Sequence, residues 1–144
     1  MLNVDIDSII PHREPIKMLT EVLEARASSG VAAAVVSSTW PLFEDGAVNS
    51  LVLIEAVAQT AAVVEGYKRQ KQGKNAVKGW MVGIKSAHFF VSSITVNTRL
   101  IISVTSKYTL DNYAVMEGEI KSGEDVLATV VLQALRLNEE DIQK

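Results

Sequence analysis

The chain has 144 residues, of which 48% are hydrophobic and 22% charged, with a net charge of −3 and no cysteine. This length suits one domain with a sizeable core, so we expect a single domain over residues 1–144. Without cysteine, disulfides and thiolate metal sites are excluded. The first seven residues contain no basic region and no long apolar stretch, so we expect no signal peptide and a cytoplasmic protein.

The first predicted elements are a helical turn at residues 7–10 and strands at residues 18–26 and 31–37, separated by a Ser-Ser-Gly turn. Residues 40–46 are expected to form an irregular connection. Asn49 or Ser50 is then expected to cap a long helix that ends near Gly66, with a length of about 16 to 18 residues and roughly 25 Å.

This helix is apolar on every side, because Glu55, Gln59 and Thr60 are the polar residues between positions 51 and 64. Such a helix belongs inside a protein, and its run is too short for a membrane span, which needs about 20 apolar residues. Glu55 and Gln59 are four residues apart, so they share a helical face. Burying a carboxylate costs roughly several kcal/mol unless it is paired, neutralised or used, so Glu55 is the first candidate for chemistry.

Strands are predicted from there on, at residues 80–91, 99–109, 114–121 and 126–137. One buried helix and about six strands joined mostly as hairpins predict an α+β protein in which a long curved antiparallel sheet wraps the helix. This is the hot-dog fold. Four alanines at positions 56, 58, 61 and 62 permit close approach of a second subunit, so we expect a homodimer or a larger assembly.

The charges are unevenly distributed, because residues 66–110 contain no Asp or Glu but several Lys and Arg. This basic stretch either attracts an acidic partner or suits the negative end of the helix and the loop after it. No aromatic residues alternate with these charges in a known motif, so nucleic acid is not an expected partner.

Residues 9–16 read Ile-Ile-Pro-His-Arg-Glu-Pro-Ile, and residues 53–59 read Leu-Ile-Glu-Ala-Val-Ala-Gln. The first segment resembles the N-terminal Leu-Pro-His-Arg-x-Pro motif of the 3-hydroxyacyl-[acyl carrier protein] dehydratases of fatty acid synthesis. The second resembles the helix motif of the same family, Leu-x-Glu-Ala-x-Ala-Gln. Residues 42–49 and 54–59 resemble more closely a branch of that superfamily found in aryl polyene gene clusters. The resemblance implies a hot-dog fold, a thioester substrate linked to acyl carrier protein or coenzyme A, and Glu55 as a catalytic residue.

The chain departs from the housekeeping dehydratases in one important place. Those enzymes carry a catalytic histidine in a His-Phe-Pro-Gly motif before the glutamate, where this chain has Thr-Trp-Pro-Leu at residues 39–42. The Pro-Gly at the start of their helix is replaced by Asn49-Ser50. Acyl carrier protein is strongly acidic and would suit the basic stretch.

Dehydration of a 3-hydroxyacyl thioester needs a base for the C2 proton, an acid for the departing hydroxide and donors for the thioester oxygen. Burial is expected to raise the pKa of Glu55, which could then act as acid, base or both in turn. Gln59 either orients Glu55 or makes a structural hydrogen bond to the sheet. The main-chain amides of Val48, Asn49 and Ser50 are candidate donors to the thioester.

The remaining candidates each have a structural alternative. His12 is a structural position or a proton carrier, and His88 is expected to be packed or partly exposed. Trp40 and Phe43 are core residues or walls of an acyl tunnel. Two separated histidines without nearby aspartates do not make a metal site, so neither a metal nor another cofactor is predicted.

Three functions from different classes stay open. The protein is an active thioester dehydratase, a catalytically inactive hot-dog subunit that binds acyl chains or supports an active paralogue, or an acyl thioesterase. The missing loop histidine favours the inactive subunit, whereas Glu55 and Gln59 favour the two enzymes. We favour the dehydratase.

Overall fold

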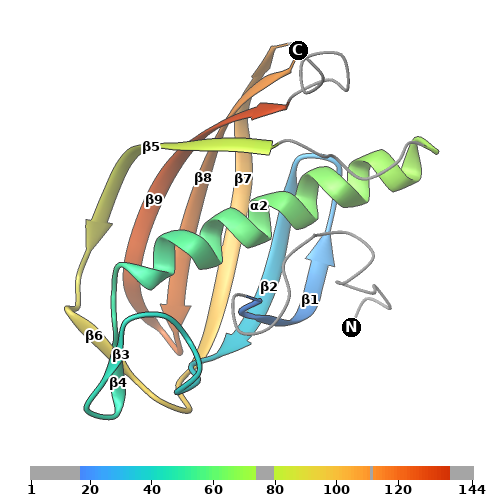
Figure 1. Cartoon of the computed structure of the whole chain (residues 1–144). Helices are drawn as coiled ribbons and strands as arrows, with labels where there is room; N and C mark the ends of the chain where they lie inside the picture. The colour runs from blue at the N-terminus through green and yellow to red at the C-terminus, as the bar shows by residue number, and fades with distance from the viewer. Residues whose placement is uncertain (1–16, 74–79, 111, 137–144) are drawn as a thin grey trace.

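The computed structural model describes residues 17–73, 80–110 and 112–136, and in it a single long helix lies across the face of a curved sheet (Figure 1). The sheet has six strands in the order β1-β2-β7-β8-β9-β5, and every neighbouring pair is antiparallel. Its strands are β1 (Leu19–Ala25), β2 (Ser29–Val35), β5 (Trp80–Phe89), β7 (Arg99–Leu110), β8 (Tyr113–Ser122) and β9 (Asp125–Arg136). This arrangement confirms the predicted α+β hot-dog fold.

The six predicted strands are confirmed, with ends displaced by no more than two residues. The irregular connection predicted at residues 40–46 is only partly correct, because it contains a short strand. A second, three-stranded sheet is formed by β3 (Phe43–Glu44), β4 (Ala47–Asn49) and β6 (Ser93–Thr95). Strands of two or three residues are too short to show an alternating pattern in the sequence. The turn between β3 and β4 uses left-handed backbone at Asp45 and Gly46, with φ of 53° and 80°.

The central helix, α2 (Val52–Lys71), has 20 residues and is longer than predicted. The expected end at Gly66 is wrong, since this glycine is buried within the helix. The chain instead leaves the helix at Gly73, which has a φ of 73° and whose N–H donates to the Gln70 carbonyl at 3.0 Å. Glycine reaches this left-handed conformation without the cost that a Cβ imposes.

The start of α2 also differs from the expectation. Leu51 occupies the N-cap position and makes no side-chain capping bond. Asn49 lies two residues earlier, and its Oδ1 accepts a hydrogen bond from the Leu51 N–H at 2.9 Å. An asparagine side chain readily satisfies a main-chain donor two residues further on, so Asn49 fixes the turn that leads into the helix.

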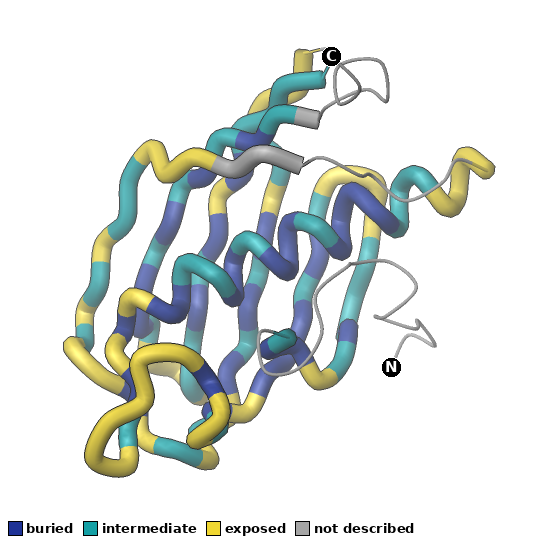
Figure 2. The backbone as a smooth tube through the Cα atoms, viewed as in Figure 1, coloured by how far each residue is buried: buried dark blue, intermediate teal, exposed yellow. Residues whose placement is uncertain are grey.

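The core lies between α2 and the concave face of the sheet, and the buried residues follow the helix and the strands that it crosses (Figure 2). Two strand glycines allow this close approach. A Cβ on Gly118 of β8 would lie 2.5 Å from Cγ1 of Val57, and a Cβ on Gly30 of β2 would lie 2.8 Å from Cγ2 of Val64. The absence of a side chain at these two positions therefore sets the distance between helix and sheet.

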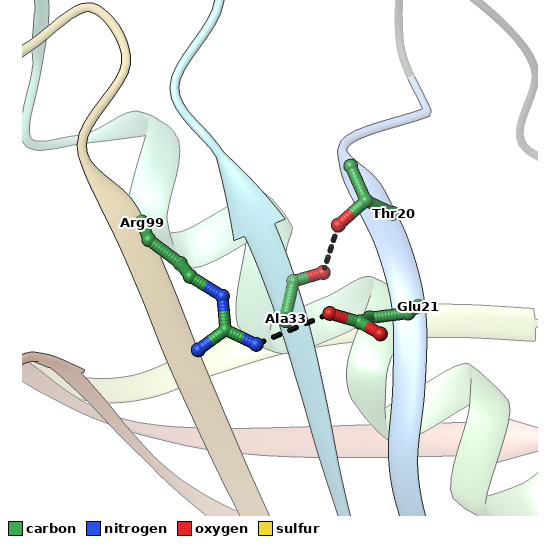
Figure 3. A network of polar contacts seen from close by, with 4 residues as sticks. All are labelled: Thr20, Glu21, Ala33 and Arg99. Atoms are coloured by element: carbon green, nitrogen blue, oxygen red, sulfur yellow. Dashed lines mark hydrogen bonds and ion pairs between the residues drawn. The ribbon is translucent and has the colours of Figure 1, made fainter. Parts of the chain in front are cut away.

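Polar contacts on the other side of the sheet tie its first edge strand to the strands beside it (Figure 3). The Thr20 hydroxyl donates to the Ala33 carbonyl at 3.1 Å, which links β1 to β2. Arg99 Nη2 of β7 lies 3.1 Å from Glu21 Oε1 of β1, so this ion pair reaches across β2. Both side chains are partly exposed, so we attribute to the ion pair a contribution of at most about 1 kcal/mol.

Within the described residues, no helix is both long enough and apolar enough to cross a bilayer.

We predict that Gly118→Ala destabilises the protein, because the new methyl group would overlap Val57, whose β-branched side chain has little rotameric freedom in a helix. Overpacking of this kind costs typically about 1–3 kcal/mol, which chemical denaturation will measure.

The matched control is Gly83→Ala in β5, where a Cβ would meet nothing within 4 Å. The double variant with Val57→Ala is expected to recover part of the loss, because the smaller side chain removes the overlap. Equal stability of Gly118→Ala and Gly83→Ala would contradict the close contact between Gly118 and Val57.

Candidate active site on the central helix

Glu55 lies in the first turn of α2 and is partly exposed, so the prediction that the whole run around it is buried is wrong for a single chain. The helix buries the side that faces the sheet, and a strip of residues on its far side stays partly open to solvent. Leu51 on this strip is 53% exposed, and Ile54, Ala58 and Ala62 are half-buried. A sheet that curves around a helix from one side covers only part of its circumference, which is why this strip is open.

Gln59 connects Glu55 to the beginning of the sheet. Its Nε2 donates to Glu55 Oε1 at 3.1 Å, and its Oε1 accepts from the main-chain N–H of Met18 at 2.9 Å. The side chain is fully buried, with 0% exposure. Gln59 therefore makes both of the contacts that the sequence left as alternatives, one to the candidate catalytic group and one to the chain entering β1.

Met18 is the part of this site that sequence reasoning missed. Its contribution is a main-chain N–H and comes from a residue 41 positions away from Gln59. A main-chain donor is present at nearly every residue, so neither residue type nor spacing could have identified it. The neighbouring polar residue of the helix, Thr60, is also buried, but its hydroxyl donates to the Ala56 carbonyl at 2.8 Å.

Two of the three main-chain amides proposed to bind the thioester oxygen are already used within the chain. The Asn49 N–H donates to the Leu42 carbonyl at 3.1 Å, and the Ser50 N–H donates to the Ser92 carbonyl at 3.0 Å. In this structure both N–H groups therefore already have an acceptor within the chain. Val48 lies in β4, between β3 and β6, and its fully buried side chain belongs to the hydrophobic core.

Residues 39–43, where the housekeeping dehydratases have the histidine loop, place one aromatic side chain in the core and one at the surface. Trp40 is 5% exposed and belongs to the hydrophobic core, whereas Phe43 is 40% exposed in β3. Thr39 is exposed, and its Oγ1 lies 2.8 Å from Ser37 Oγ. The structure thus places Trp40 in the core and Phe43 at the surface.

The structure describes one of the two histidines. His12 lies outside the described residues, as do the predicted turn at residues 7–10 and the first dehydratase-like motif. His88 is exposed on β5 and is paired in register with Thr129. In the part of the chain that the structure describes, no group of three or more His, Asp or Glu residues could hold a metal ion.

The basic stretch is divided among several places. Lys68, Arg69 and Lys71 lie in the last turn of α2, where positive charge is favourable next to the helix C-terminus. Arg99 pairs with Glu21, and Lys107 Nζ lies 3.8 Å from Glu117 Oε2. These positions agree with the structural interpretation of the basic residues as helix-end and surface charges.

Comparisons with known proteins agree with this fold. The 3-hydroxyacyl-[acyl-carrier-protein] dehydratase FabZ of Burkholderia cenocepacia is 26% identical, over 90% of this chain and 92% of that protein. FabZ of Xylella fastidiosa is 26% identical over 87% and 82%.

Among solved structures, the dehydratase heterocomplex ApeI:P from Xenorhabdus doucetiae superposes with a TM-score of 0.90 at 22% identity, covering 99% of this chain and 97% of that one. A hypothetical thioesterase with coenzyme A from Streptococcus pneumoniae reaches 0.65 at 13% identity, covering 82% and 85%. The family described as ApeP-like, ApeP dehydratase, matches residues 4–144. Because this match spans nearly the whole sequence, the chain belongs to the ApeP-like dehydratase family.

Proposed function

We propose that the protein removes water from a 3-hydroxyacyl thioester, carried by acyl carrier protein, in fatty acid or polyene synthesis. The observation that carries this proposal is the Glu55 carboxylate, which Gln59 holds at 3.1 Å on the open strip of the central helix. The family and the FabZ relatives, named as 3-hydroxyacyl-[acyl-carrier-protein] dehydratases, support the reaction.

The reaction requires that one proton leaves C2 and that hydroxide leaves C3 as water. A single carboxyl group can serve both events if it accepts the first proton and returns it to the departing hydroxide, which leaves the group unchanged after turnover. Glu55 takes this role in our proposal, because the loop that carries the histidine in the housekeeping dehydratases here contains Trp40 in the core. His12 remains a second proton carrier within the proposal.

The open strip also supports association with a second copy of the chain. Leu51, Ile54 and Ala58 present an apolar surface that a partner would remove from water, and the alanines permit close approach. In a homodimer formed through this strip, Glu55 would lie at the interface, shielded from solvent on the side that the sheet does not cover. The acyl chain would then occupy an apolar environment next to the carboxylate.

A second candidate function is a catalytically inactive subunit that supports an active paralogue. The observation that favours it is the replacement of the histidine loop. In the segment found here, the Thr39 hydroxyl is hydrogen-bonded to the Ser37 hydroxyl, and Trp40 is buried. The structurally similar ApeI:P protein is itself described as a dehydratase heterocomplex. Under this alternative, the chain shapes an acyl-binding site that another protein completes.

We predict that Glu55→Gln lowers the rate of dehydration by about 10²–10⁴-fold, the range usual for loss of a general acid or base. The assay incubates purified protein with a 3-hydroxyacyl carrier protein and follows the loss of water by mass spectrometry. Release of the acyl group in place of water would select the thioesterase.

Glu65→Gln is the matched control, because Glu65 is a second carboxylate of α2, 9% exposed and ten residues further along. It is expected to keep the wild-type rate. Turnover that persists undiminished in Glu55→Gln would rule out the site, and a wild-type protein that is inactive alone but accelerates a paralogue would select the supporting subunit.

We further predict that Ala58→Arg converts the assembly to monomers, because a charged side chain in the centre of the strip would have to be buried without a partner. Light scattering coupled to size-exclusion chromatography measures the mass. Thr105→Arg, at an exposed position of β7, is the control and is expected to leave the mass unchanged. A wild-type protein that is already monomeric would disprove the homodimer.

A further inference from the structure

Leu42 combines an unfavourable backbone conformation with an exposed side chain. Its φ is 60°, in the left-handed region, and its side chain is 56% exposed. A residue with a Cβ meets steric hindrance in this region, which glycine avoids and asparagine tolerates. Such a conformation persists only where the surrounding structure holds it. Within a single chain, an exposed leucine gains no burial that would offset this strain.

Hydrogen bonds hold Leu42 beside the start of α2. Its carbonyl accepts from the Asn49 N–H at 3.1 Å, and Asn49 Oδ1 in turn accepts from the Leu51 N–H at 2.9 Å. The next residue of the loop, Phe43, is 40% exposed, and Leu51 is 53% exposed. The loop before β3 and the start of α2 lie exposed at the same end of the molecule (Figure 2). Leu42 and Phe43 therefore extend the apolar strip of α2 onto the loop.

The two ends of this extended strip carry opposite charges. Glu44 and Asp45 lie next to the apolar loop residues, and both are exposed. Lys68, Arg69 and Lys71 lie in the last turn of α2, and this end of the helix projects beyond the sheet (Figure 1). Neither Glu44, Asp45 nor Lys68 forms an ion pair with another described residue. These three charges are therefore available for opposite charges on a partner.

A second copy of the chain fits this surface when it is turned end for end. A two-fold axis across the middle of the strip, near Ala58, makes the two helices antiparallel, so the start of each helix faces the last turn of the other. The apolar strips then meet, and the acidic loop of each copy lies against the basic turn of the other. Two copies with parallel helices would instead place like charges together, which is unfavourable.

We propose that Leu42 is held in left-handed backbone so that a second copy of the chain buries its side chain, with Glu44 and Asp45 placed against the partner's basic turn. Removal of the leucine from water offsets the strain of its backbone. The proposal rests on the homodimer described under the proposed function, and it adds the loop at residues 42–45 to that interface. This loop thereby acts in assembly.

The first test removes the leucine side chain and keeps its backbone. Leu42→Asn introduces a residue that tolerates the left-handed region, so the loop is expected to keep its shape. We expect the dissociation constant of the dimer to rise by about 10- to 100-fold, because each interface loses two buried leucines. Light scattering over a dilution series measures this constant. Leu110→Asn is the matched control, since Leu110 in β7 is also 56% exposed, and it is expected to leave the constant unchanged.

The strain provides a second readout, with the opposite sign. In monomers made with Ala58→Arg, the added Leu42→Asn substitution is expected to raise the melting temperature by about 2–5 °C, because the strain is relieved and no partner is present to bury the leucine. A fall in the melting temperature would show that Leu42 stabilises its own chain, which contradicts the proposal.

An exchange of charges tests the end-for-end arrangement. Glu44→Lys and Lys68→Glu are each expected to weaken the dimer by about 3- to 10-fold at low ionic strength, because each places like charges together at both ends of the interface. The double variant is expected to recover most of this loss, since the opposite charges face each other again. A double variant that dissociates as readily as the single ones would refute the arrangement.

Leu42→Asn dimers that are as tight as wild type would overturn the proposal. A wild-type protein that is monomeric would overturn the homodimer and this proposal together. Association is measured without substrate, so a wild-type dimer that removes no water from a 3-hydroxyacyl carrier protein would contradict the proposed reaction alone.

Discussion

The packing of one helix into the concave face of the sheet is the constraint on which the rest of this structure depends. It requires that the helix axis lie close to the strands, and Gly118 beneath Val57 and Gly30 beneath Val64 make that distance possible. Interiors pack with few voids, so even one added methyl group at these positions would have to be accommodated by a shift of the helix. The position of every group on α2, including Glu55, follows from this contact.

The same packing explains why the candidate site lies where it does. A sheet that approaches from one side buries one face of the helix and leaves the other to solvent or to a partner. Glu55 lies on the boundary, so its carboxyl group is reachable from outside while Gln59, one turn further along, is completely buried. A buried amide that contacts a reachable carboxylate combines a fixed geometry with access for substrate, which catalysis requires.

Much of the fold could be predicted from the sequence, because the signals for it are local and repeated. Runs of strand-forming residues between turn residues located the six strands of the main sheet, and the apolar run around Glu55 located the helix. Gly66 misled the prediction of the helix end, since glycine is a common stop signal but is also accepted inside a helix with tertiary packing. The small sheet around Val48 was missed because its strands are too short to show a period.

The sequence by itself determined the hot-dog fold, the family resemblance and the choice of Glu55 and Gln59, since residue type and four-residue spacing place both side chains on one helical face. Only the tertiary structure decided what these residues do to each other. The orientation of Gln59 depends on a main-chain N–H far away in sequence, and the amides of Asn49 and Ser50 are occupied by carbonyls of other segments. Such contacts form between main-chain groups that all residues share, so they become visible only when the chain is folded.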